Sequence, residues 1–212
     1  MSPADIIPFN PLEKKNLGES VAQALICQPV VCLAELLPFD GAGIYAIYYT
    51  GDFDCYQTLV QYNINGRFCA PIYAGKAVPK GSRKGAELDL APGKAIYNRI
   101  KQHVKSIEQA KNLCLSDFYC RYLIVDDIWI PLGESLLIAK SNPLWNLLID
   151  GFGNHDPGKG RHAGLRPRWD VLHPGRPWAD KCKPREETDL HIKREVTDYL
   201  AQNPLLNIGR EV

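Results

Sequence analysis

Residues 43–49 read Gly43-Ile44-Tyr45-Ala46-Ile47-Tyr48-Tyr49, and residues 71–75 read Pro71-Ile72-Tyr73-Ala74-Gly75. The first stretch is rich in aromatic and β-branched side chains, which are typical of a buried strand. Residues 71–74 have the same character, so we expect them to form the partner strand. Tyr45 and Tyr73 would then lie near each other on neighbouring strands.

The flanking sequence predicts helices and one more strand around this pair. Residues 1–37 are expected to form an arm and a helix, with apolar positions at helical spacing and Asn16 or Ser20 as its cap. We assign no structure to the insertion at 52–66. Further elements are expected at 77–93 (loop), 93–110 (helix), 118–125 (strand), 131–139 (helix), 151–185 (irregular, anchored by Trp169 and Trp178) and 186–202 (helix).

These elements predict an α/β fold with a small, mainly antiparallel three-stranded sheet flanked by helices. An N-terminal arm and a C-terminal basic extension complete it. We divide the chain into residues 1–37 (arm and helix, a candidate dimer contact), 38–150 (core) and 151–212 (basic DNA-contact segment and terminal helix). The length of 212 residues suits one elaborated domain.

Composition narrows the class of protein. The chain is 45% hydrophobic and 23% charged, an ordinary globular profile, and no apolar run approaches a membrane span. The first residues lack the pattern of a signal peptide, so we expect a cytoplasmic protein with no membrane partner. The seven cysteines include no C-x-x-C pair, which favours reduced, mostly buried thiols.

Positive charge is concentrated in two blocks, although the net charge is only +1. Residues 76–105 hold eight basic and two acidic residues, and residues 151–185 hold eight basic and three acidic ones. Such blocks are typical of phosphate contact, although solvated basic loops would give the same count. The candidate DNA-binding residues are Lys76, Lys80, Arg83, Lys84, Lys159, Arg161, Arg166 and Arg168.

Six residues along the chain carry the functional groups that phosphodiester hydrolysis needs. They are Tyr45, Tyr73, Arg99, His103, Glu134 and Asn146. Arg99 and His103 are four apart on one predicted helix and share a face, where Arg99 can hold an anionic phosphate and His103 can accept a proton. A buried phenol such as Tyr45 needs a cation or a hydrogen-bond partner to act as a base.

Each of these residues also has an ordinary structural explanation when it is taken alone. Tyr45 could be a core tyrosine, Arg99 and His103 could lie at an exposed helix border, and Asn146 could be a loop amide. Glu134 could simply complement a helix dipole. As the one carboxylate of an apolar helix, Glu134 is also a candidate metal ligand, and Asn146 could hold it or a phosphate.

The order Gly-Ile-Tyr, Tyr-x-Gly, Arg-x-x-x-His, Glu and Asn, from Gly43 to Asn146, resembles the GIY-YIG nuclease superfamily. This stretch covers about half the chain. Ala74 stands where that family usually has Ile or Val, and the gap between the two tyrosines is longer than in minimal members. His103 stands where many members have Tyr, and in this the chain is similar to the stand-alone type II restriction endonucleases of the superfamily.

The resemblance implies a DNA endonuclease with one Mg²⁺ per active site, held by Glu134. Tyr45, assisted by Tyr73 and His103, would activate water, and Arg99 would stabilise the transition state. Since one such site cuts one strand, we expect a homodimer that cuts double-stranded DNA at a short palindrome, which the restriction branch suggests is GC-rich.

Three alternatives stay open at this point. A homing- or repair-type nuclease of the same superfamily would share the core but usually carries a separate DNA-binding module. A DNA-binding protein on a dead nuclease scaffold would share the fold. Asn154, His155 and His162 weakly suggest a ββα-metal nuclease site, although no clear hairpin precedes them.

Overall fold

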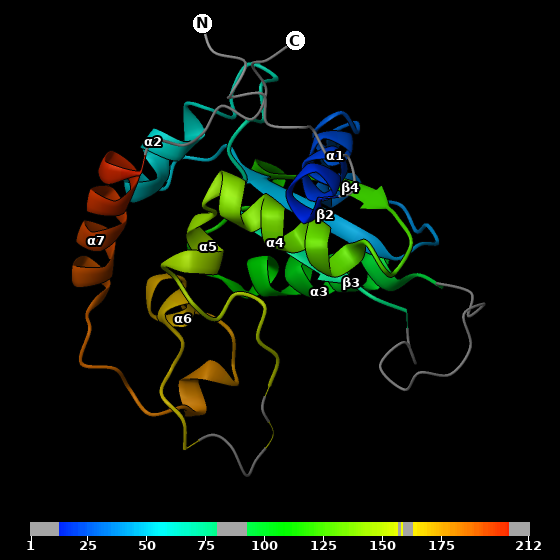
Figure 1. The fold of residues 1–212 in the computed structure, drawn as a ribbon. Helices are drawn as coiled ribbons and strands as arrows, with labels where there is room; N and C mark the ends of the chain where they lie inside the picture. Colours follow the sequence, from blue (N-terminus) through cyan, green and yellow to red (C-terminus); the bar gives the residue numbers. More distant parts are fainter. Residues whose placement is uncertain (1–12, 80–92, 157, 159–162, 204–212) are drawn as a thin grey trace, which may run out of the picture.

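A computed structural model describes residues 13–79, 93–156, 158 and 163–203 of the chain. Within these ranges the elements form an α/β fold with one antiparallel sheet and helices on both faces (Figure 1). The predicted fold class is therefore confirmed. No helix in this part of the chain is both long enough and apolar enough to cross a membrane.

The sheet has four strands in the order β1-β4-β2-β3, not the three expected from the sequence. The three longer strands are β2 (Gly43–Tyr49), β3 (Tyr73–Ala77) and β4 (Phe118–Ile124), and every ladder is antiparallel. The fourth strand, β1 (Val31–Cys32), pairs with β4. Two residues are too few to show a period-two pattern, which is why the sequence did not reveal β1.

The central strand β2 is buried along its whole length, because both faces of the sheet are covered. Tyr45, Ile47 and Tyr49 belong to one apolar cluster. Ile44, Ala46 and Tyr48 belong to a second cluster on the opposite face. The continuous apolar run of this strand follows from its place between two layers of helices.

Helix α3 (Ala95–Gln109) and several shorter or later helices cover the first face, and two helices cover the second. Helix α3 contributes Ile96, Ile100 and Ile107 to the first cluster. Helices α1 (Lys14–Ile26) and α4 (Ile130–Ser141) pack against each other over the second face (Figure 1). The side chain of Glu13 at the start of α1 makes no capping bond, and neither Asn16 nor Ser20 is its N-cap, so that expectation was wrong.

Shorter elements build the rest of the molecule. The insertion after β2 contains the 3-10 helix η3 (Asp54–Tyr56) and α2 (Gln57–Val60), and two further 3-10 helices, η2 (Leu33–Glu35) and η5 (Leu115–Asp117), precede β2 and β4. After α4 come α5 (Leu144–Leu147), α6 (Arg168–Leu172), η7 (Ala179–Lys181) and α7 (Asp189–Gln202). Helix α7 contacts η3, α2 and α6, so the end of the chain packs on the insertion.

Trp169 is fully buried, as expected of an anchor for the segment after α5. All seven cysteines are free thiols, also as expected. They are buried less often than predicted: Cys55, Cys120 and Cys182 are buried, whereas Cys27 and Cys114 are exposed.

Candidate active site

The two predicted phenols come together on one face of the sheet, beside its edge strand β3. Tyr45 lies opposite Gly75, and Tyr73 lies opposite Ile47, so the two tyrosines are diagonal neighbours. Their ring centroids are 6.3 Å apart. A Cβ on Gly75 would lie only 2.5 Å from the hydroxyl oxygen of Tyr45, so the ring of Tyr45 crosses β3 where Gly75 leaves room.

Gly43 is required by the sheet rather than by the tyrosines. Its φ of +152° lies in a region that L side chains rarely adopt. A Cβ at this position would also lie 2.0 Å from the carbonyl oxygen of Leu123 on β4. The first glycine of the motif therefore lets β2 enter the sheet in the register that places Tyr45 over Gly75.

Helix α3 brings a histidine and an arginine to the same place. The hydroxyl of Tyr45 is 2.7 Å from Nε2 of His103, and both side chains are buried. The ring of Tyr73 meets the ring of His103 edge to face, with centroids 4.9 Å apart. The predicted placement of this helical face against the sheet edge agrees with the structure.

Burial keeps this hydrogen-bonded pair neutral. The pKa of Tyr45 is raised well above 10, mainly by burial and also by Tyr73, although Arg99 opposes the rise. The pKa of His103 is lowered well below 6.5, mainly by burial and then by the positive charge of Arg99. The pair is thus a phenol beside a neutral imidazole, and not a stored phenolate.

The guanidinium of Arg99 faces both phenols and a loop from the C-terminal third of the chain. It lowers the pKa of Tyr45 and of Tyr73 in opposition to burial. Its Nη2 donates to the carbonyl oxygen of Gly153 at 3.2 Å, and its Nη1 lies 2.7 Å from Nε2 of His155. Nη1 also donates to the side chain of Gln102. Arg99 is therefore a fixed cation beside the phenol pair.

Glu134 approaches from the other face of the sheet, on helix α4. Its carboxylate forms an ion pair with Lys76 of β3 at 2.6 Å, and its side chain is 19% exposed. Its negative charge raises the pKa of both Tyr45 and Tyr73, so it belongs to the same electrostatic site. Because β3 is the edge of the sheet, side chains from both faces can approach each other around it. In this way Glu134, on α4, lies near the site residues on α3.

The donor set suits a metal ion that takes most of its ligands from elsewhere. In the described ranges no group of three or more His, Cys, Asp and Glu side chains could hold a metal. A single partly exposed carboxylate fits Mg²⁺, which commonly uses one or two protein carboxylates and completes its octahedron with water and phosphate oxygens. It does not fit zinc, which needs three or four protein ligands.

Asn146 lies at the site, and its side-chain amide forms hydrogen bonds with the backbone of Ala74. Its Oδ1 accepts from the amide of Ala74, and its Nδ2 donates to the carbonyl of Ala74, both at 2.8 Å. Ala74 separates Tyr73 from Gly75, so Asn146 holds the edge strand that carries the second phenol. The prediction that Asn146 itself handles phosphate stays a prediction.

The predicted DNA contacts fall into three groups. Lys80, Arg83, Lys84, Lys159 and Arg161 lie outside the described residues, as does His162. Lys76 is 40% exposed beside Glu134. Arg166 and Arg168 are turned toward the protein: Arg166 donates to the carbonyl of Ala179, and Arg168 pairs with Glu187 and Glu195. Those contacts favour a structural role for these two arginines.

The sequence did not point to one wall of the site, which comes from residues 152–155. Phe152 stacks on His103 with centroids 4.5 Å apart, and its edge meets the ring of Tyr73. Gly153 and His155 contact Arg99. The sequence signal in this segment is the Asn154-His155 pair, which suggests a different kind of metal site. The site is therefore closed by a segment outside the predicted core.

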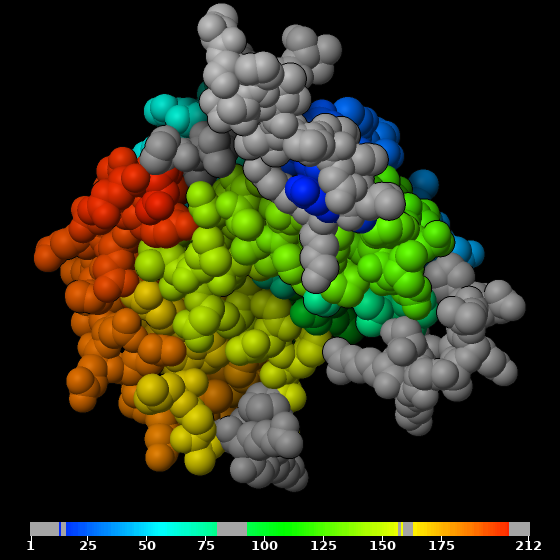
Figure 2. All heavy atoms as spheres, viewed as in Figure 1, coloured from blue at the N-terminus to red at the C-terminus, as the bar shows by residue number. Residues whose placement is uncertain are grey.

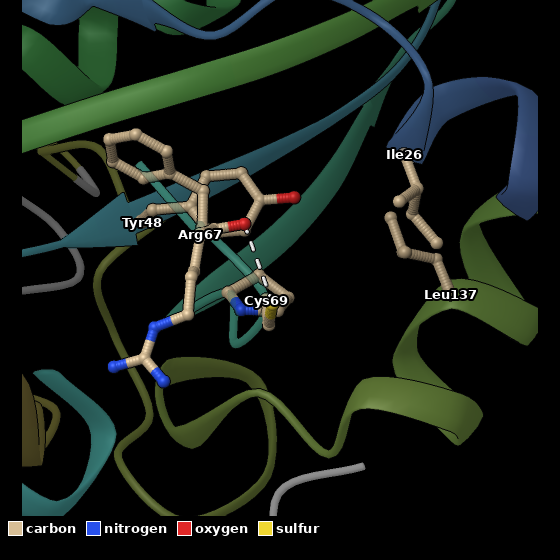
Figure 3. Close-up of a pocket in the computed structure, with 7 residues that line it drawn as sticks. Ile26, Tyr48, Arg67, Cys69 and Leu137 are labelled. Carbon is tan, nitrogen blue, oxygen red and sulfur yellow. Dashed lines mark hydrogen bonds between the residues drawn. The ribbon is translucent and has the colours of Figure 1, made fainter. Parts of the chain in front are cut away.

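A separate small pocket lies on the opposite face of the sheet. Its lining includes Ile26 of α1, Tyr48 of β2, Arg67, Cys69 and Leu137 of α4 (Figure 3). It contains none of the six predicted catalytic residues, so it is not the active site.

A family model described as the Eco29kI GIY-YIG domain matches residues 37–200, which is more than half of the chain. No curated protein matches the chain significantly. The matched region includes the phenol pair, α3, Glu134 and also the wall formed by residues 152–155.

Proposed function

Because the chain belongs to the Eco29kI GIY-YIG family and is thus a restriction-type DNA endonuclease, we propose that it cuts both strands of DNA at a short, GC-rich palindrome. In this proposal it acts as a homodimer with one Mg²⁺ per active site, and Tyr45, Tyr73, Arg99, His103 and Glu134 carry the reaction. The following paragraphs give the observations that support each part.

The contact between Tyr45 and His103 carries the proposal. At 2.7 Å, a neutral phenol lies beside a neutral imidazole in a buried setting. Such a pair can relay a proton: the oxygen of Tyr45 takes one from the attacking water as its own proton passes to Nε2 of His103. The water oxygen bonds to phosphorus, the bond to the leaving oxygen breaks, and solvent protonates the leaving oxygen.

Fixed charges would stabilise the developing phosphorane. Arg99 offers a permanently charged, forked donor set next to both phenols, in the position where an anionic phosphate would be stabilised. Glu134 would hold the Mg²⁺, which supplies Lewis-acid stabilisation of the phosphate when it is bound. Lys76 neutralises Glu134 in the free protein, so we expect it to turn toward the DNA when the cation binds.

The homodimer and the palindrome follow from stoichiometry. The described residues form one such site per chain, and one site hydrolyses one strand at a time. Two copies related by a twofold axis would present two sites to the two antiparallel strands. A protein dimer with twofold symmetry recognises a DNA sequence with the same symmetry, which is a palindrome. Arginine and lysine are the side chains that pair best with guanine edges, which suits a GC-rich site.

Glu134→Ala provides the test of the metal assignment. Plasmid DNA is incubated with the wild-type chain in Mg²⁺ or in EDTA, the ends are sequenced, and the variant is assayed in parallel. We expect discrete ends at one palindrome, no cutting in EDTA, and at least about 10²-fold slower cutting by Glu134→Ala. DNA binding by the variant should stay near that of the wild type.

The paired control is Glu19→Ala, which removes an exposed carboxylate that pairs with Lys140 on the same side of the sheet. This control should cut normally. Wild-type cleavage by Glu134→Ala in Mg²⁺ would remove Glu134 from the metal site. Ends scattered over the plasmid would contradict the palindrome.

A further inference from the structure

Residues 152–155 form one wall of the active site, although they follow the last helix of the predicted core. In Figures 1 and 2 this segment is yellow and lies in the lower part of the view, after α5. A Cβ on Gly153 would lie 3.1 Å both from Nη2 of Arg99 and from the hydroxyl of Tyr73. The wall is therefore in tight contact with two of the proposed catalytic residues, Arg99 and Tyr73.

A buried arginine fixes the position of this wall. Arg176 is 1% exposed, pairs with both carboxylate oxygens of Asp170 at 2.6 and 2.5 Å, and packs on the rings of Trp169 and Trp178. Its remaining N–H groups donate to three backbone carbonyls. These are the carbonyl of Gly151, just before the wall, at 2.8 Å, and those of Phe152 and Asn154, in the wall, at 3.2 Å. Three carbonyls held by one rigid, fully charged fork leave the backbone before His155 little freedom.

The contact between His155 and Arg99 has only one possible polarity. A guanidinium only donates, so Nε2 of His155 must accept from Nη1 across the 2.7 Å contact, and the ring proton must lie on Nδ1. The bond therefore exists only while His155 is neutral. Burial, Arg99 and Arg176 together lower the pKa of His155 below 6.5, which keeps the ring neutral at pH 7.

We propose that His155 is a positioning residue for DNA cleavage, which holds the guanidinium of Arg99 in the orientation that meets the scissile phosphate. The proposal rests on the proposed function, because it assumes that Arg99 binds that phosphate. Together with Gln102 and the carbonyl of Gly153, His155 engages three of the four terminal N–H donors of Arg99. The remaining donor capacity of Arg99 is then held beside the phenols, where the phosphate would enter, and no rotamer search is needed during the reaction.

This role predicts a specific dependence on acid. Among the described residues, Arg99 of α3 contacts the ring of His155, and Arg176 and His103 interact with it electrostatically. None supplies a negative charge, so a protonated His155 would lose its acceptor atom and repel Arg99. Cleavage should therefore slow as the pH falls through the pKa of His155, whereas DNA binding should not weaken.

The test compares His155→Leu with His155→Gln. Glutamine can place an amide oxygen near the position of Nε2, whereas leucine offers no acceptor. Single-turnover cleavage in Mg²⁺ is measured with DNA binding in Ca²⁺, and His191→Leu is the control because His191 is an exposed histidine on α7. We expect His155→Leu to cut about 10- to 100-fold more slowly with binding within about twofold of wild type.

The glutamine variant separates positioning from packing. His155→Gln should keep at least about a third of the wild-type rate and should retain that rate at lower pH than the wild type does. Wild-type rates for His155→Leu, equal losses in both variants, or a loss confined to binding would each overturn the proposal.

Arg99→Ala separates this inference from the proposed function. If Arg99→Ala cuts slowly while His155→Leu cuts normally, only the role of His155 fails. If Arg99→Ala itself cuts at the wild-type rate, the assignment of the phosphate-binding residue fails with it.

Discussion

Two glycines contribute to this site by leaving space, although they carry no functional group. Gly43 allows β2 to pass the carbonyl of Leu123, and Gly75 leaves the space over which the ring of Tyr45 lies. Both act on the position of one hydroxyl. The spacing of the motif is therefore a steric requirement for the contact between Tyr45 and His103.

Gly75→Ala tests this reading at the scale of a single methyl group. The new Cβ would lie 2.5 Å from the hydroxyl of Tyr45 and 3.0 Å from a ring carbon of Tyr73, so the phenol must shift from the position in which it contacts His103. We expect cleavage to fall about tenfold or more, while the protein still folds.

Thermal unfolding and single-turnover assays measure these two effects separately. Normal cleavage by a folded Gly75→Ala variant would show that the position of the phenol is not critical.

The site residues differ in how far the sequence could predict them. The motif resemblance singles out Tyr45, Tyr73, Arg99 and His103, and strand pairing and helical periodicity predict that they meet, because those rules fix which side chains share a face. His155 does not, because it reaches Arg99 through an irregular loop held by a distant arginine. The bonding of Asn146 to Ala74 was equally hidden, since residue type does not say which partner an amide chooses.

At the scale of elements, a second buried tyrosine–histidine pair joins four separate parts of the chain. Tyr56 of η3 lies 2.7 Å from Nε2 of His173, which follows α6. Trp145 of α5 donates to the same hydroxyl, and Asn112 lies 3.0 Å from the other ring nitrogen of His173. This polar junction lies in the interior, where it fixes the insertion against the C-terminal segment.

The junction predicts a loss of stability in acid. Burial lowers the pKa of His173 from 6.5 to about 3, so between these pH values the unfolded chain binds a proton that the folded chain does not. The stabilising contribution is thus complete above pH 6.5 and declines as the pH falls toward 3, by about 1.4 kcal/mol per pH unit. Burial also lowers the pKa of His103, so His103 too lowers the stability of the folded chain as the pH falls.

Urea unfolding between pH 7 and pH 5 measures this slope. His173→Gln should be less stable at pH 7 but should show a flatter dependence on pH. His191→Gln, at an exposed position, should keep the wild-type slope. Equal slopes in all three proteins would mean that His173 does not control acid stability.

The elements themselves were predictable where they are long and periodic. The strands around Tyr45 and Phe118 and the helices α3 and α4 follow from patterns of apolar residues. An acidic start predicts helix α7, and the helix begins at Asp189 rather than at Glu186. The partner strand begins and ends later than expected, at Tyr73 and Ala77. The two-residue strand β1 and the short helices at 54–60 could not be predicted, because tertiary contacts stabilise them and no local period marks them.

At the scale of the whole molecule, four arginines of the second basic block form ion pairs within the protein. Arg166 and Arg176 pair with Asp180 and Asp170 of the same block, whereas Arg168 and Arg185 pair with Glu187 and Asp150 outside it. A count of charges along the sequence cannot show this, because it does not reveal which partner each guanidinium finds. The C-terminal third therefore serves first as a scaffold that closes the active site.

The two buried tyrosine–histidine pairs give the whole account a matched test. Both hydroxyls lie 2.7 Å from a histidine Nε2 and both tyrosines are buried, but only Tyr45 lies beside Arg99 and Tyr73. Tyr45→Phe and Tyr56→Phe each remove one oxygen and keep the ring. They differ in whether the lost hydroxyl belongs to the proposed relay, and the hydroxyl of Tyr56 also accepts from Trp145.

Single-turnover cleavage of a plasmid in Mg²⁺ by these two variants is the most direct test of the central claim. We expect Tyr45→Phe to bind DNA normally and to cut at least about 10²-fold more slowly than the wild type. Tyr56→Phe should lose about 1–3 kcal/mol of stability, because it leaves buried partners unpaired, and should cut normally below its unfolding temperature. Wild-type cleavage by a folded Tyr45→Phe protein would contradict the claim that this phenol relays the proton of the attacking water.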